Sequence, residues 1–269
     1  MNTNSNTYTV IYSTILVVVV AAVLAFASTA LKGKQEENVK VDTVSQILTA
    51  AGFKAENNVL ETYIEHIEAA ILVNAEGVEV GVLNTENVKD LQVYGNSELK
   101  AQIGASEQKL PVYIFDNGVT VVPCYGAGLW GPIWGYIGVQ SDLTITKACF
   151  GHKGETPGLG AKITDEPAAF ADNFTNKTIT AAINVSKNVT GENDVNAISG
   201  ATITSTAAGV MVNQWLGFYQ GYFTENADEC CEDACCTEEC CEGTCCEDTE
   251  QCCEGECCES VETVEESNN

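Results

Sequence analysis

An uncharged apolar run near the N-terminus places the strongest constraint on the fold. It covers residues 10–31, and its 22 residues include no Asp, Glu, Lys, Arg or His. As an α-helix it would be about 33 Å long, enough to cross the hydrocarbon core of a membrane. A cleaved secretory signal has a basic start and a shorter apolar core, whereas residues 1–9 contain no Lys. We therefore predict an uncleaved, single-pass transmembrane helix over residues 10–31.

Charge is the second constraint, because the 269 residues include 38 Asp and Glu but only 12 basic residues, all of them Lys. Proteins that bind nucleic acid contact its phosphates through basic surface, so the net charge of −26 argues against a nucleic-acid partner. Without Arg, the chain also has no guanidinium fork to grip a phosphate. A phosphate-bearing ligand would have to be held by backbone amides, by Lys or covalently.

The composition changes sharply after Phe223, where we place a domain boundary. Residues 225–269 hold 12 of the 14 Cys, together with 17 Asp and Glu and no Lys. The Cys pairs are five or seven residues apart, which is not the spacing of a zinc finger. We predict a disordered, acidic, Cys-rich low-complexity tail over 224–269. Soft-metal binding or disulfide formation is the alternative, and the first candidate ligands are Cys230, Cys231, Cys235 and Cys236.

Hydrophobic spacing in the rest of the chain predicts a small α+β domain, with helices packed on a twisted antiparallel sheet. The predicted helices cover residues 35–51, 59–70, 165–170 and 202–218. The predicted strands cover 112–115 and 119–123, joined by an Asp-Asn-Gly turn, and 133–139, 143–150 and 178–185. We divide the chain into a short N-terminal segment (1–9), the transmembrane helix (10–31), a helical part of the soluble region (32–100), the α+β domain (101–223) and the tail (224–269).

Two glycine-bearing segments, 126–131 and 154–160, flank a pair of predicted strands. Neither is a Walker loop or a dinucleotide fingerprint, but each provides backbone that can approach a planar ligand closely. Trp130, Trp134 and Tyr136 lie beside them and could flank an aromatic ring system. Core packing is the better interpretation for Trp134, which falls in a strand. For Trp130, in a glycine loop, a ligand contact and a structural role both stay open.

Histidine is too scarce to build a hydrolytic or metal site in the domain. The chain contains only His66, inside a predicted helix and therefore expected to be structural, and His152, beside the glycine segments. One His near a loop does not make a metal site, and no Ser-His-Asp set can be assembled. We predict no catalytic residue and no firm metal site in the domain.

The sequence Ser199-Gly200-Ala201-Thr202 leads directly into the last predicted helix. Such a turn presents free backbone N–H groups and the positive end of the helix dipole to an anion. It also places the Thr202 hydroxyl where a phosphate would sit. An ordinary N-cap is the alternative interpretation, because Ser and Thr are favoured at that position.

The two motifs Glu155-Thr156-Pro157-Gly158-Leu159-Gly160 and Ser199-Gly200-Ala201-Thr202, in this order behind one N-terminal anchor, resemble those of the NqrC family. Its members are the C subunits of the sodium-translocating NADH:quinone oxidoreductase, Nqr. The resemblance covers about residues 8–222. The G subunits of the Rnf complexes share the FMN-binding domain and are more distant. The resemblance implies FMN joined through its phosphate to a threonine by a separate flavin transferase, and the matching acceptor is Thr202.

The resemblance also implies which residues lie near the flavin. They are Gly128, Leu129, Trp130, Glu155, Thr156, Gly158, Leu159, Gly160, Ser199, Gly200 and Ala201. The chain departs from the family at Asn196, where Asp is usual, with Asp194 nearby, and at Lys153, where His is frequent and is found one place earlier. The Cys-rich tail lies outside the family pattern.

The role implied by the resemblance is electron transfer inside a complex of six subunits in the cell inner membrane. The family member relays electrons between an iron–sulfur centre and the next flavin on the way to quinone, coupled to Na⁺ export, and has no NADH site. A protein of the Rnf type, and a membrane-anchored metal-binding protein that acts through its tail, are the alternatives. Lys32 and Lys34 follow the membrane run and favour a cytoplasmic body. The resemblance implies a periplasmic one, which we adopt because two lysines are a small bias.

Overall fold

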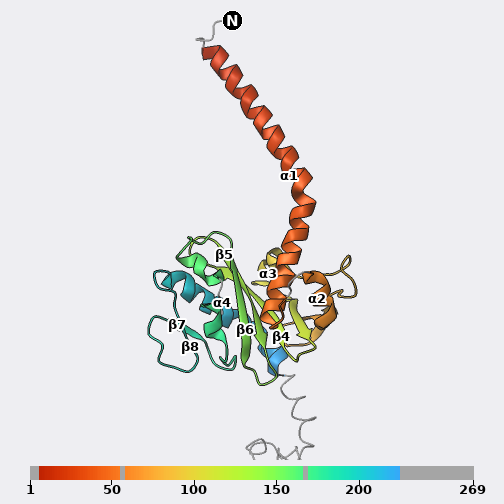
Figure 1. Cartoon of the computed structure of the whole chain (residues 1–269), viewed down its shortest axis with the longest axis vertical. Coiled ribbons are helices and arrows are strands. Elements are labelled where there is room, and N and C mark those ends of the chain that lie inside the picture. Colours follow the sequence, from red (N-terminus) through yellow and green to blue (C-terminus); the bar gives the residue numbers. More distant parts are fainter. Residues whose placement is uncertain (1–5, 55–57, 166–168, 225–269) are drawn as a thin grey trace, which may run out of the picture.

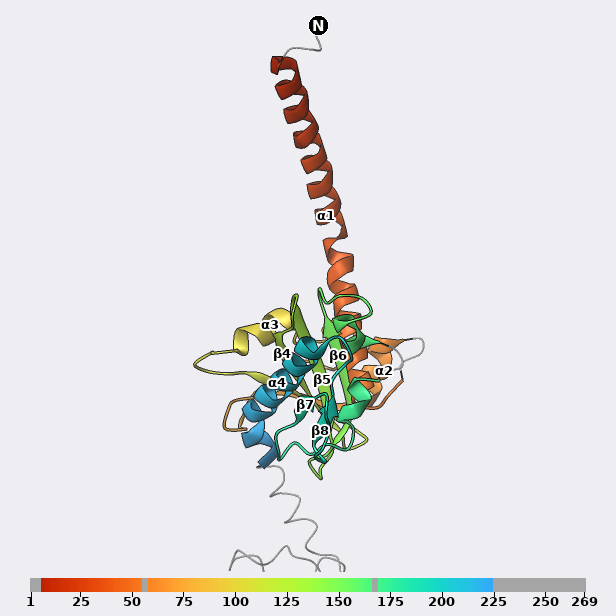
Figure 2. The ribbon, with the colours of Figure 1, turned by 90° about the vertical axis from the view of Figure 1, so that its left-hand side faces the viewer.

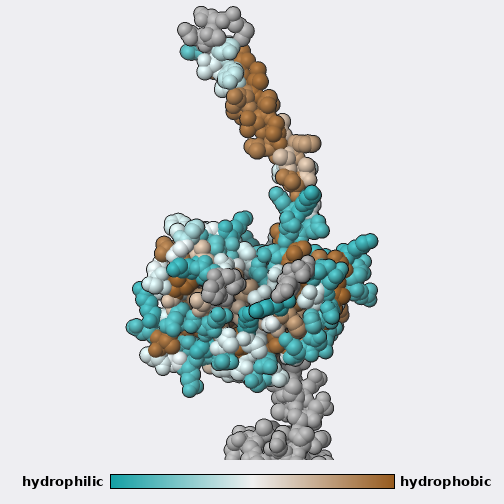
Figure 3. Space-filling model, viewed as in Figure 1, coloured by the Kyte–Doolittle hydropathy of each residue, from teal (hydrophilic) through white to brown (hydrophobic). Residues whose placement is uncertain are grey.

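The apolar N-terminal run is part of one long helix. In the computed structural model, which describes residues 6–54, 58–165 and 169–224, α1 extends over Asn6–Ala50. The helices predicted over 10–31 and 35–51 are therefore continuous (Figure 1). The outer part of α1 is long and apolar enough to cross a membrane, and its side chains are exposed. Figure 3 shows this apolar band, separated from the body of the molecule by a hydrophilic stretch of the helix.

Six antiparallel strands form the main sheet, in the order β2-β1-β3-β4-β5-β6. Their bounds are β1 Ile67–Val73, β2 Glu79–Val82, β3 Leu110–Phe115, β4 Thr120–Ala127, β5 Pro132–Val139 and β6 Ile145–His152. Tyr113 of β3 lies opposite Val121 of β4, which confirms the predicted hairpin. The strands predicted over 133–139 and 143–150 correspond to β5 and β6, and the predicted α+β class is confirmed.

The two faces of the sheet are covered by different helices (Figure 1). One face packs against α4, Thr202–Phe218, whose bounds are those predicted. The other face packs against the end of α1 and against α2, Val59–His66. Because successive strand residues point to opposite faces, Val112 belongs to the first core and Tyr113 to the second.

Helix α4 lies across the sheet (Figure 2). It is held there by a stripe of buried residues at helical spacing. Ala208, Met211, Val212 and Trp215 form this stripe. Each large buried side chain contributes about 1.5–3 kcal/mol relative to full exposure. The Trp215 indole N–H also donates a hydrogen bond of 2.7 Å to the carbonyl oxygen of Tyr125 in β4. These contacts hold the second half of α4 against the end of β4.

Smaller elements complete the body. They are α3 Asn96–Gln102, the 3₁₀ helices η1 Gly160–Thr164 and η2 Ala171–Phe174, and the parallel strand pair β7 Asn184–Ser186 and β8 Asp194–Asn196. The helix predicted over 165–170 lies partly outside the described residues, and η1 and η2 flank it. The predicted tail, including its four candidate metal ligands, lies outside the described residues from 225 onward.

Two predicted elements differ from the structure. The helix predicted over 59–70 ends at His66, because Ile67 begins strand β1 and pairs with Phe115. The segment 32–100, predicted to be helical, thus supplies two strands of the sheet. The strand predicted over 178–185 is reduced to β7. The Asn193 side-chain amide donates hydrogen bonds to carbonyl oxygens in this segment, those of Thr178 and Ala181 among them. These backbone groups are therefore paired with a side chain instead of with a neighbouring strand.

Candidate functional site

The turn over residues 199–202 delivers Thr202 as the first residue of α4. Gly200 has φ = 80°, a left-handed conformation that favours glycine. Ala201 is the N-cap residue, and no side-chain hydrogen bond caps α4. Thr202 is therefore inside the helix and half-buried, and it is not an ordinary N-cap. The first N–H groups of α4 remain available to an anion placed at this turn.

The hydroxyl groups of the first turns of α4 differ in accessibility. Thr204 is buried and donates its hydroxyl proton to Glu155 Oε2 at 2.8 Å. Ser205 is also buried, and its hydroxyl donates to the carbonyl oxygen of Ala201 at 2.9 Å. Thr206 is exposed, one turn after Thr202. Only Thr202 and Thr206 among these four groups are open to a reaction partner.

Glu155 is the buried charged residue of the site, with 4% of its surface exposed. Its Oε1 accepts a hydrogen bond of 2.9 Å from the backbone N–H of Trp130, in addition to the bond from Thr204 at Oε2. The backbone N–H of Glu155 donates to Nδ1 of His152 at 3.3 Å. One side chain thus joins the loop 128–131, the loop 153–160 and the first turn of α4.

The glycines of these loops fall into two groups. A Cβ atom on Gly128 would lie 2.5 Å from Glu155 Oε1, and one on Gly160 would lie 2.4 Å from Oε2. These two residues are in contact with the carboxylate. Gly158, in contrast, has φ = 75° and open space around it. It lies in the exposed stretch 156–159, together with Thr156 and Leu159.

Large apolar side chains are exposed around Thr202. They are Leu129, Trp130, Leu159, Ile203 and Val210, between 44% and 68% exposed. A groove of about 530 Å³ runs along α4 from Thr202, within the size range of small-molecule sites. We call it the apolar groove. Its lining consists of Gly126, Ala127, Thr202, Ile203, Thr206, Ala207, Val210, Met211 and Gln214.

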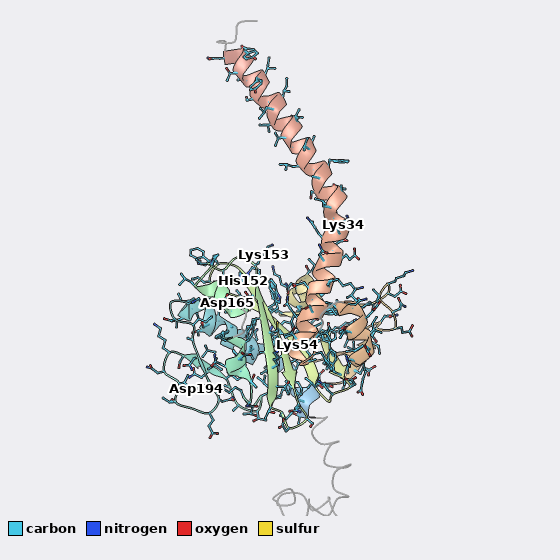
Figure 4. The ribbon with its side chains drawn as sticks, viewed as in Figure 1. Lys34, Lys54, His152, Lys153, Asp165 and Asp194 are labelled. Carbon is cyan, nitrogen blue, oxygen red and sulfur yellow. The ribbon has the colours of Figure 1, made fainter. Side chains whose placement is uncertain are left out.

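The site lies at the end of the body that faces the outer, apolar part of α1. The Trp134 indole N–H, in β5, donates to Gln46 Oε1 of α1 at 2.9 Å. Farther along both elements, Gly138 lies against the carbonyl group of Ala50. Strand β5 therefore runs alongside α1 in the same direction, and its beginning, with the glycine loops, is nearer the apolar part of α1. Figure 4 shows His152 and Lys153 at this edge of the body, on the side of Lys34.

Other residues singled out from the sequence make packing contacts or hydrogen bonds that support the fold. His66 stacks on Phe53, with ring centroids 4.1 Å apart, and its Nδ1 lies 2.9 Å from Asp116 Oδ2. This confirms its structural role. Trp134 is half-buried, as expected for a packed side chain. Hydrogen bonds from the backbone N–H groups of Thr190 and Gly191 lower the pKa of the Asp194 carboxyl, so Asp194 is engaged in its own turn.

Sequence reasoning missed most of the apolar groove. It singled out Thr202 and the glycine-bearing segment 126–131, whose first two residues line the groove, but not Ala207, Val210 or Met211 of α4. The signal was available, because residues four apart on a helix share a face. Thr206 and Val210 follow Thr202 by four and eight residues, so they lie on the same face of the helix. Nothing local connects that face to Gly126 and Ala127, since β4 and α4 are about 80 residues apart in the chain.

Comparison with known proteins agrees with this geometry. Residues 128–217 match the FMN-binding domain family. A crystal structure of the C subunit of Na(+)-translocating NADH-quinone reductase, NqrC, from Parabacteroides distasonis is 33% identical, covers 72% of this chain and 97% of that one, and has a TM-score of 0.61. This chain belongs to the NqrC family.

Further members of the NqrC family show the same relationship. The NqrC of Haemophilus ducreyi is 29% identical over 232 residues, which is 79% of this chain and 90% of the relative. That of Vibrio anguillarum is 25% identical over 224 residues, 75% of this chain and 87% of the relative. The crystal structure of NqrC from Shewanella oneidensis is 23% identical and shares the fold, with a TM-score of 0.57 over 71% of this chain and 98% of that one.

Proposed function

We propose that this chain is the FMN-carrying electron-transfer subunit of a membrane Na⁺-translocating NADH:quinone reductase, with FMN attached through its phosphate to Thr202. One observation carries the proposal. The Thr202 hydroxyl stands at the uncapped start of α4, at one end of the apolar groove. The membership of the NqrC family and the match to the FMN-binding domain support it.

The residues present fit FMN. An ester between the Thr202 oxygen and the flavin phosphorus would place the phosphate at the helix N-terminus, where backbone N–H groups and the helix dipole favour an anion. The apolar groove and the exposed side chains of Leu129 and Trp130 offer apolar surface to a flat ring. A covalent bond also holds a phosphate in a chain that has no Arg.

The chain's own residues would bind and orient the cofactor, while the bound flavin supplies the transfer of one or two electrons. Electrons would pass between an iron–sulfur centre and the next flavin on the way to quinone, in a complex of six subunits that exports Na⁺. The position of the site at the edge facing the membrane helix supports exchange with a membrane-embedded partner. We place the anchor in the cell inner membrane and the body in the periplasm, and we assign flavin attachment to a separate transferase.

The test is a comparison of Thr202→Val with Thr206→Val in cells that produce the flavin transferase. The two residues are one turn apart on the same helix face, and both line the apolar groove. Thr202→Val keeps the side-chain size but removes the oxygen, so flavin fluorescence after denaturing electrophoresis should vanish. Thr206→Val should retain it. Fluorescence that persists in Thr202→Val and disappears in Thr206→Val would move the attachment site by one turn and contradict the assignment of Thr202.

A further inference from the structure

The buried carboxylate of Glu155 connects the two parts of the candidate flavin site that lie farthest apart in the chain. Its Oε2 accepts the hydrogen bond from Thr204, which is two residues after Thr202 in the same helical turn. Its Oε1 accepts from the backbone N–H of Trp130, a residue that is 68% exposed. One side chain therefore bridges the first turn of the acceptor helix and the aromatic loop.

The surroundings of this carboxylate are fitted to it. The Cα atoms of Gly128 and Gly160 take positions at which any β-carbon would collide with one of the two oxygens. A buried charge is expensive unless it is hydrogen-bonded, and both oxygens of Glu155 have donors. The nearby N-terminus of α4 adds a favourable dipole. Glu155 thus points into the protein, and it is the loops around it that reach the surface.

We propose that Glu155 is a positioning residue of the flavin site. Its carboxylate holds the Trp130 loop against the first turn of α4, so that the surface beside Thr202 is shaped before any flavin is attached. This inference rests on the proposed function and changes the role that the family resemblance implies for Glu155, from a flavin contact to a support for the segments that make the contacts.

The first experiment is amide hydrogen exchange on the full chain in detergent, produced without the transferase. In Glu155→Ala the Trp130 N–H loses its acceptor, and its exchange should be at least about tenfold faster, because leaving a buried partner unsatisfied is costly. In Glu155→Gln the side-chain oxygen can still accept from Trp130, and the amide can donate to the Thr204 oxygen. Glu155→Gln should therefore restore slow exchange.

A matched pair of threonine variants separates positioning from general destabilisation. Thr204→Val removes the donor to Oε2 and should accelerate exchange at Trp130 by a smaller factor than Glu155→Ala. Thr43→Val removes another buried helical hydroxyl, one that is hydrogen-bonded to Tyr136 in the second core. It should lower stability to a similar degree but leave exchange at Trp130 unchanged.

The second experiment uses protein matured by the transferase and measures quenching of flavin fluorescence by iodide together with the visible absorption spectrum. Glu155→Ala and Thr204→Val should expose the flavin to iodide and shift its spectrum, whereas Glu155→Gln and Thr43→Val should match wild type. Wild-type exchange and wild-type quenching in folded Glu155→Ala would overturn the inference. If Glu155→Ala does not fold, Thr204→Val decides in the same way. A wild-type chain that never acquires flavin would instead refute the proposed function, while the exchange experiment would still decide the role of Glu155.

Discussion

Gly160 offers a sharp test of the packing around Glu155, because its neighbour Gly158 is a natural control. A Cβ on Gly160 would lie 2.4 Å from Glu155 Oε2 and 2.8 Å from Thr204 Oγ1. In Gly160→Ala the carboxylate would have to withdraw by about 1 Å to reach the 3.4 Å at which ordinary contact begins. That movement breaks its hydrogen bond with Thr204. Gly158→Ala meets no atom within 4 Å and suffers only from its φ of 75°.

The expected costs follow from these geometries. A buried acceptor left without its donor costs about 1–3 kcal/mol, and an overpacked site costs about 1–3 kcal/mol more. We take about 3 kcal/mol for Gly160→Ala, which lowers the melting temperature of a domain of this size by roughly 6–12 °C. A left-handed conformation costs an alanine about 1 kcal/mol, so Gly158→Ala should lose only about 2–4 °C.

The assay is thermal unfolding of the full chain in detergent, followed by tryptophan fluorescence, with a double-mutant cycle. In the Glu155→Ala background the carboxylate is gone, and Gly160→Ala should cost at least about 1 kcal/mol less than it does alone. A melting temperature for Gly160→Ala close to that of Gly158→Ala would refute the reasoning. Strict additivity of Glu155→Ala and Gly160→Ala would refute it as well, because the clash would then lie elsewhere.

Three further predictions concern the ends and loops of the chain. A chain that ends at Phe223 should still acquire covalent flavin in cells with the transferase, because the motifs and the groove precede this residue; a folded but colourless product would contradict the boundary. A thiol reagent that cannot cross the inner membrane should label the tail of mildly reduced cells once the outer membrane is permeabilised, with the chain ending at Phe223 as the control for Cys124 and Cys149. Labelling that requires lysis of the inner membrane would place the body in the cytoplasm. Gly158→Val should change the flavin spectrum or occupancy without affecting membrane insertion, and an unchanged spectrum and reduction potential would show that the exposed loop is only structural.

Local sequence patterns determined the elements whose stability comes from their own residues and from one packed face. The uncharged run 10–31 predicted the outer part of α1, since only a helix satisfies the backbone of such a segment in a membrane. The apolar stretch that directly follows Ser199-Gly200-Ala201 predicted α4 with its observed bounds. The Asp-Asn-Gly turn predicted the β3–β4 hairpin, because its chemistry is contained in three neighbouring residues.

Tertiary structure decided the rest. Residues 67–70 continue a helical pattern in the sequence, yet they pair with β3, because hydrogen bonding to a partner strand outweighs the weak preferences of a short segment. The role of Glu155 was beyond local reasoning, since its two donors are 25 and 49 residues away in the chain. The sequence could mark Gly128 and Gly160 as unusual. Only the fold shows the reason. It brings the two glycines to either side of one buried carboxylate, which leaves no room for a β-carbon at either position.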